Sequence, residues 1–168
     1  MSYSKKKSVN RGKDQDPFTR AKEYAFLLLK FRLRSEHELY SRLKKKGFPE
    51  NTIRKAVSFL KEKGFVDDSI FAQAWLNSRL KRPFGLRRIT QELKLKGVGR
   101  EVIAEQVRGL KESYSEEKVV EELARLKLDK MKSIEPQKAR QRLYGYLARR
   151  GFSSAAIIDV INKLQRQP

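Results

Sequence analysis

The apolar residues of the chain recur at fixed distances from three glycines, Gly47, Gly97 and Gly151. An isoleucine follows each glycine after six residues, a valine or isoleucine after ten and a leucine after thirteen, and further apolar residues precede each glycine by four and eight. The matched residues are Leu39, Leu43, Ile53, Val57 and Leu60; Ile89, Leu93, Ile103, Val107 and Leu110; and Leu143, Leu147, Ile157, Ile161 and Leu164. Because spacings of three and four residues share one helix face, each copy is predicted to hold two amphipathic helices that meet at the glycine. Glycine takes the left-handed conformation that ends a helix, so these glycines are predicted C-caps.

A further helix is predicted before each pair, over residues 20–31, 67–81 and 115–131. Asp67 or Asp68 and Ser115 are suited to cap the second and third of these helices. Helix starts within the pairs are indicated by a capping box of Ser35 and Glu38 and by Pro136 in a first turn. The predicted fold is therefore all-α, with three tandem three-helix repeats in an elongated, curved array in which each repeat mainly contacts its neighbours.

The predicted boundaries are a basic tail over residues 1–18 and repeats over 19–65, 66–112 and 113–168. The first 17 residues contain five basic side chains and no apolar period, so we expect this segment to be disordered and to act, if at all, by attracting phosphate.

Composition excludes several classes of chemistry. The chain has no cysteine and a single histidine, His37, so disulfides, thiolate metal sites and histidine-based relays lack their residues. No Walker loop, dinucleotide fingerprint or nucleophile elbow is present. We therefore expect no enzymatic activity and no cofactor. The most apolar stretch, residues 24–31, is too short to span a bilayer, and no apolar segment follows the N-terminal lysines as in a secretory signal, so we expect a cytoplasmic protein.

The net charge of +20 favours an anionic partner, either nucleic acid or an acidic protein surface. The charge is concentrated on the second helix of each repeat: residues 35–46, 85–96 and 138–150 carry +2, +3 and +5, whereas the first helices over 67–81 and 115–130 carry 0 and −1. A solvated surface explains any single lysine, but three basic helices in register favour a binding surface. The predicted partner-binding residues are Lys44, Lys45, Lys46, Arg79, Arg82, Arg87, Arg88, Lys94, Lys96, Arg140, Arg149 and Arg150.

Residues 67–80, "DDSIFAQAWLNSRL", and 85–98, "GLRRITQELKLKGV", resemble the central unit of the RecX family, bacterial regulators of the recombinase RecA. The resemblance covers essentially residues 21–164. It implies three tandem three-helix repeats, binding within the groove of the RecA filament on DNA, and inhibition of strand exchange, ATP turnover and coprotease functions in recombination and the SOS response. It also implies that the chain acts as a monomer on a nucleoprotein filament.

Two other functional classes stay open beside a RecA regulator. The six-residue step from glycine to isoleucine also resembles a helix-turn-helix, which would make the protein a direct DNA binder, but the helices that would read bases are poor in arginine. The charge could then act on phosphates without reading sequence. The third class is a helical scaffold whose charge serves only solubility. Ile70, Phe71 and Trp75 are expected in the core or between repeats, with an exposed Trp75 as a possible docking residue.

Overall fold

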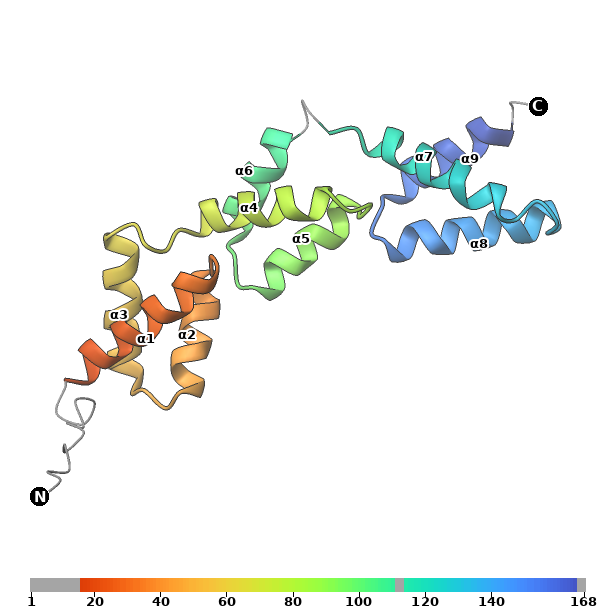
Figure 1. Ribbon diagram of the computed structural model, residues 1–168. Helices are drawn as coiled ribbons and strands as arrows, with labels where there is room; N and C mark the ends of the chain where they lie inside the picture. The colour runs from red at the N-terminus through yellow and green to blue at the C-terminus, as the bar shows by residue number, and fades with distance from the viewer. Residues whose placement is uncertain (1–15, 111–113, 166–168) are drawn as a thin grey trace, which may run out of the picture. The chain divides into compact units, whose positions relative to one another are not determined.

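The computed structural model of the 168-residue chain describes residues 16–110 and 114–165, and these contain nine α-helices and no strand (Figure 1). The helices are α1 (Pro17–Phe31), α2 (Glu36–Lys45), α3 (Glu50–Glu62), α4 (Asp68–Leu80), α5 (Leu86–Leu95), α6 (Arg100–Leu110), α7 (Glu116–Asp129), α8 (Pro136–Arg149) and α9 (Ser154–Gln165). The chain forms two compact units that divide between Asp67 and Asp68. The first unit holds the first repeat, α1 to α3, and the second unit holds the other two repeats. Most of the predicted N-terminal tail, residues 1–15, lies outside the described residues.

The three repeated glycines end their helices as predicted. Gly47, Gly97 and Gly151 have φ angles of 90°, 77° and 84°. At the first of these, the N–H of Gly47 donates to the carbonyl of Lys44 and the N–H of Phe48 donates to that of Leu43, the two bonds of a Schellman motif. The same pair of bonds recurs after α5 and after α8. The C-cap prediction is therefore confirmed.

The buried residues group into one core per repeat. The first repeat buries two adjoining clusters around Leu43 and Leu39, the second a cluster around Ile89 and Leu93, and the third a cluster around Leu147. Of the fifteen matched apolar positions, eleven are less than 5% exposed, and these are Leu39, Leu43, Ile53, Leu60, Ile89, Leu93, Ile103, Leu143, Leu147, Ile157 and Ile161. The spacing thus identified the side chains that hold each repeat together.

The predicted caps Ser35 and Ser115 and the predicted start at Pro136 are confirmed, one helix start is corrected, and the cap predicted at Asp67 or Asp68 stays a prediction. Ser35 accepts the N–H of Glu38 at 3.1 Å, Ser115 accepts that of Lys118 at 3.3 Å, and Pro136 opens α8. The first helix begins at Pro17 rather than at residue 20, because Asp16 accepts the N–H of Thr19 at 3.2 Å and proline suits the first helical position.

The second unit joins its two repeats through backbone contact at two glycines. The N–H of Gly85 donates to the carbonyl of Arg150 at 2.9 Å. A Cβ added at Gly85 would overlap the carbonyl group of Gly151, and one added at Gly151 would overlap the side chain of Arg88. The two turns therefore approach as closely as they do only because neither glycine has a side chain.

Candidate functional site

The basic residues at the end of α2 form the predicted surface of the first unit. Lys44, Lys45 and Lys46 are all exposed. The ammonium of Lys44 lies 6.0 Å from the ring centre of Tyr40, and that of Lys46 lies 5.5 Å from the ring centre of Tyr24. Each of these two exposed lysines thus places its ammonium group over an aromatic face.

Glu92 of α5 gathers two of the predicted arginines of the second repeat. Its Oε1 accepts the Nε–H of Arg88 at 3.2 Å, and its Oε2 accepts the indole N–H of Trp75 at 3.1 Å. The Nε of Arg79 lies 2.7 Å from Oε2 as an ion pair, although its N–H is not aimed at that oxygen. Trp75 and Arg79 therefore join α4 to α5 through Glu92, whereas Arg88 pairs with the same carboxylate from within α5.

Aromatic rings hold further predicted cations in place. Lys96 lies over Trp75 with its ammonium 4.1 Å from the ring centre, and the guanidinium of Arg79 lies 4.5 Å from the same ring. Phe71 is buried and Trp75 is partly buried, as expected, whereas Ile70 is 53% exposed, so the packing expected for Ile70 is wrong. Trp75 is thus a structural residue of the second repeat, with both cations packed on its ring.

Arg150 links the second repeat to the third. Its Nη1 donates to the carbonyl of Pro83 at 3.1 Å, and its own carbonyl accepts from Gly85. The guanidinium also lies 4.7 Å from the ring centre of Tyr146 and 5.9 Å from that of Phe84. The basic side chain that the sequence assigns to a partner surface is half-buried and contacts Pro83 and Phe84 of the second repeat and Tyr146 of the third.

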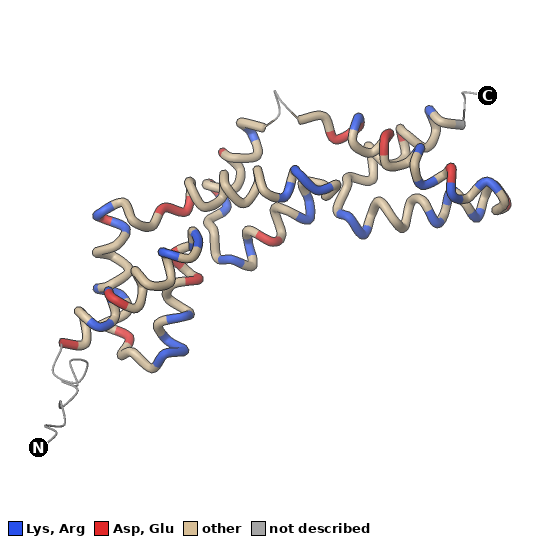
Figure 2. Tube along the Cα trace, viewed as in Figure 1, with Lys and Arg blue, Asp and Glu red and all other residues tan. Residues whose placement is uncertain are grey.

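The remaining predicted residues are exposed and are less engaged with the rest of the protein than Arg79, Arg88 and Arg150 are. Arg82, Arg87, Lys94 and Arg149 are exposed, and none of them forms an ion pair within the described chain. Arg140 is also exposed, and its Nη2 donates to the side-chain carbonyl of Asn162 at 3.1 Å. Figure 2 shows that basic positions, drawn in blue, recur along α5 and α8. The assignment of all twelve residues to a partner remains a prediction.

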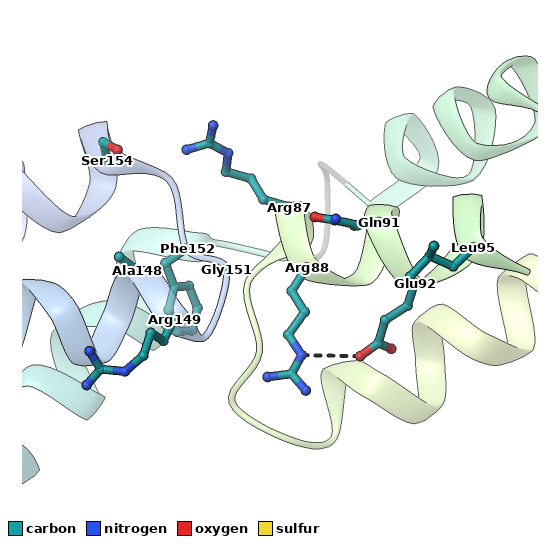
Figure 3. Close-up of a pocket in the computed structure, with 10 residues that line it drawn as sticks. All are labelled: Arg87, Arg88, Gln91, Glu92, Leu95, Ala148, Arg149, Gly151, Phe152 and Ser154. Carbon is teal, nitrogen blue, oxygen red and sulfur yellow. Dashed lines mark hydrogen bonds and ion pairs between the residues drawn. The ribbon is translucent and has the colours of Figure 1, made fainter.

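Three of the predicted arginines line one open cleft of about 560 Å³ in the second unit. Arg87 and Arg88 come from the start of α5, and Arg149 comes from the end of α8, opposite (Figure 3). The floor between the two sides is formed by Gly151 and Phe152 of the turn between α8 and α9. Figure 3 shows the three guanidinium groups pointing in different directions rather than toward one point.

Sequence reasoning missed two other residues of this cleft, Gln91 and Leu95. Leu95 is 78% exposed, the most exposed large apolar side chain among the described residues. A signal for it was present in the sequence: Leu95 follows Leu86 by nine residues, which places it on the opposite side of a helix whose buried stripe runs through Leu86. Because Leu95 also lines the cleft beside the arginines, it is a candidate contact residue.

Three family domains match the chain in succession, described as the first, second and third three-helix domains of RecX. They match residues 21–60, 67–105 and 115–161. The chain belongs to the RecX family. The family resemblance and the all-α fold of three-helix repeats are therefore confirmed.

Relatives and solved structures agree with this family. The chain is 37% identical over 155 residues to a regulatory protein RecX of Amycolatopsis mediterranei, covering 91% of this chain and 87% of that protein. It is 36% identical over 156 residues to the regulatory protein RecX of Mycolicibacterium smegmatis, covering 88% and 82%. The crystal structure of RecX from Lactobacillus salivarius has the same fold, with a TM-score of 0.80 at 17% identity over 89% of this chain and 97% of that one. The relatives are named as regulatory proteins.

The described residues contain neither a metal-binding cluster nor a helix able to span a membrane. Within residues 16–110 and 114–165, no group of three or more histidine, aspartate and glutamate side chains is arranged to hold a metal ion. None of the helices in the described part of the chain is both long and apolar enough to cross a bilayer.

Proposed function

We propose that this RecX-family protein binds the RecA filament on DNA and modulates RecA, mainly by inhibiting strand exchange, ATP turnover and the coprotease activity that serves the SOS response. Membership of a family of regulatory proteins is the observation that carries the proposal. In this role the protein would work in the cytoplasm, as a monomer, and without a catalytic centre of its own.

The distribution of charge supports a polyanionic assembly as the target. A RecA filament on DNA presents both phosphates and protein carboxylates, and the chain carries a net charge of +20. Exposed cations occur at the ends of α2, α5 and α8, including Lys45, Lys94 and Arg149. Because the repeats each supply such an end, contacts of modest strength can act together along a repetitive partner.

The test is RecA's DNA-dependent ATP hydrolysis and strand exchange at increasing amounts of the protein. We expect both to slow at or below stoichiometric amounts. Full RecA activity in the presence of excess protein would overturn the proposal.

Direct, sequence-independent DNA binding is the second candidate, favoured by the net charge. The two candidates separate when binding to single-stranded DNA is measured with and without RecA across a range of salt concentrations. Binding that depends on RecA supports the filament; binding that is unchanged without RecA, with an affinity that falls steeply with salt, supports the DNA alone.

A further inference from the structure

We propose that the cleft between α5 and the turn joining α8 to α9 binds an acidic polypeptide segment that carries an apolar side chain. The inference deepens the proposed function, on which it rests, by naming the chemistry of the partner segment and the surface that receives it. The cleft lies wholly within the second unit, and its walls come from the second and third repeats.

The unpaired charge in the cleft is positive, so we expect its ligand to be anionic. Arg87 and Arg149 are exposed on its two sides and form no ion pair within the described chain. Among the described residues that line the cleft, Glu92 is the single carboxylate, and it is already balanced by Arg79 at 2.7 Å and Arg88 at 3.2 Å. A ligand therefore meets unpaired guanidinium groups, each able to bind a carboxylate through two N–H groups.

The geometry of the cleft favours an extended ligand over a single small anion. The guanidinium groups of Arg87, Arg88 and Arg149 diverge from one another in Figure 3, so in this arrangement they present separate binding positions rather than one shared anion site. The two walls are tied by the bond from Gly85 N–H to Arg150 and by that from Arg150 to Pro83. A cleft whose walls are already fixed loses little conformational entropy when a ligand binds.

The apolar side chains favour a polypeptide over a nucleic acid. Leu95 is 78% exposed where it lines the cleft, and a polypeptide can cover it with an apolar side chain. A single strand of nucleic acid instead binds through bases stacked on exposed aromatic rings. The aromatic residue of this cleft, Phe152, is 2% exposed and offers no such face.

The direct test uses the full chain and a short fluorescein-labelled peptide of glutamate and leucine, compared with the same peptide in which serine replaces leucine. We expect the leucine peptide to bind more tightly and the preference to disappear in Leu95→Ser. The double variant Arg87→Ala/Arg149→Ala should weaken binding about tenfold, since it removes two unpaired charges from the site.

The matched control is Arg108→Ala/Lys130→Ala, which removes the same charge from the same two repeats outside the cleft, at exposed positions. It should weaken binding by no more than about twofold, because rim charges act mainly through the general field. Equal losses in the two double variants would overturn the proposal. So would a selective loss of oligothymidylate binding in the cleft variant, which would assign the cleft to nucleic acid.

RecA provides the second readout. If the wild-type chain inhibits RecA, about ten times more of the cleft variant should be needed for the same inhibition. The control variant should inhibit at the same concentration as the wild type. Inhibition that survives unchanged in the cleft variant would overturn the cleft as the contact. If the wild-type chain leaves RecA fully active, the proposed function fails and the peptide measurement alone decides the cleft.

Discussion

Gly85 and Arg150 are bonded across the boundary between the second and third repeats, with the backbone N–H of one donating to the backbone carbonyl of the other at 2.9 Å. The residues are far apart in sequence, and the bond forms because Gly85 has no side chain to meet the backbone of Gly151. The side chain of Arg150 strengthens the same joint by its bond to Pro83. Gly85 and Arg150 thus form a close backbone contact and a side-chain contact between the two repeats.

We expect Gly85→Ala to loosen this joint while leaving the core of each repeat folded, because the added Cβ would overlap the backbone of Gly151. Spin labels on Glu105→Cys and Asp159→Cys would report it as a broader distance distribution, and the chain has no native cysteine to interfere. The control is Gly109→Ala, where no atom lies within 4 Å of the added Cβ. An unchanged, narrow distribution in Gly85→Ala would show that other contacts hold the repeats.

Gly47 tests the helix caps separately from packing. It has a φ of 90° and no atom within 4 Å of an added Cβ, so a side chain there strains only the backbone. We expect Gly47→Ala to destabilise the first repeat by about 1–2 kcal/mol and Gly47→Asn by less, since asparagine tolerates the left-handed region. Hydrogen exchange of the α2 and α3 amides measures the free energy of opening. An equal loss of opening free energy in Gly47→Ala and Gly47→Asn would contradict the explanation by backbone strain at a positive φ.

Arg87 and Arg88 are adjacent in sequence and should respond differently to reversal of charge. Arg88 pairs with Glu92, and its guanidinium lies 4.2 Å from the ring centre of Phe84. Arg88→Glu removes both contacts and places two carboxylates four residues apart, so we expect a loss of about 1 kcal/mol in the free energy of unfolding. Arg87→Glu should change it by less than about 0.5 kcal/mol, as a surface substitution. Urea unfolding followed by the fluorescence of Trp75 compares them, and a similar loss in both would show that Arg87 is also structural.

The third repeat should lose stability in acid through Glu121. The ammonium of Lys163, bonded at 2.7 Å, and the guanidinium of Arg125 hold the pKa of this carboxylate below its usual value. Its contribution is therefore fully present above the ordinary glutamate pKa and is lost as the pH falls through the lowered value. We expect Glu121→Gln to lower the melting temperature at neutral pH. In acid, the melting temperatures of the variant and the wild type should converge. Glu122→Gln, at an exposed neighbouring position, is the control, and a gap between Glu121→Gln and wild type that persists at low pH would contradict the titration.

The helices and their caps could be predicted because their causes are local, whereas the family was identified from the resemblance of residues 67–80 and 85–98 to its central unit. Residues three and four apart in sequence share a helix face whatever the rest of the chain does, so the spacing around Gly97 identified Ile89, Leu93 and Ile103 as core residues. A glycine after a basic turn ends a helix through bonds to residues three to five positions earlier. Asp16 was missed as a cap because it lies in a polar segment. The sequence around it looks the same whether its carboxylate is solvated or accepts the N–H of Thr19.

The sequence could not separate basic residues that hold the fold from those that remain available to a partner. Arg149 and Arg150 are neighbours with the same charge, yet one is exposed on the cleft and the other is bonded to Pro83, 67 residues away. That difference depends on which turn of the second repeat meets the end of α8, and no periodicity within a repeat contains this information. The sequence by itself determined the helices, their caps, the core of each repeat and the excess of positive charge. Only the tertiary structure decided which cations contact another helix or repeat, as Arg79 and Arg150 do, because those contacts depend on distances between segments that are remote along the chain.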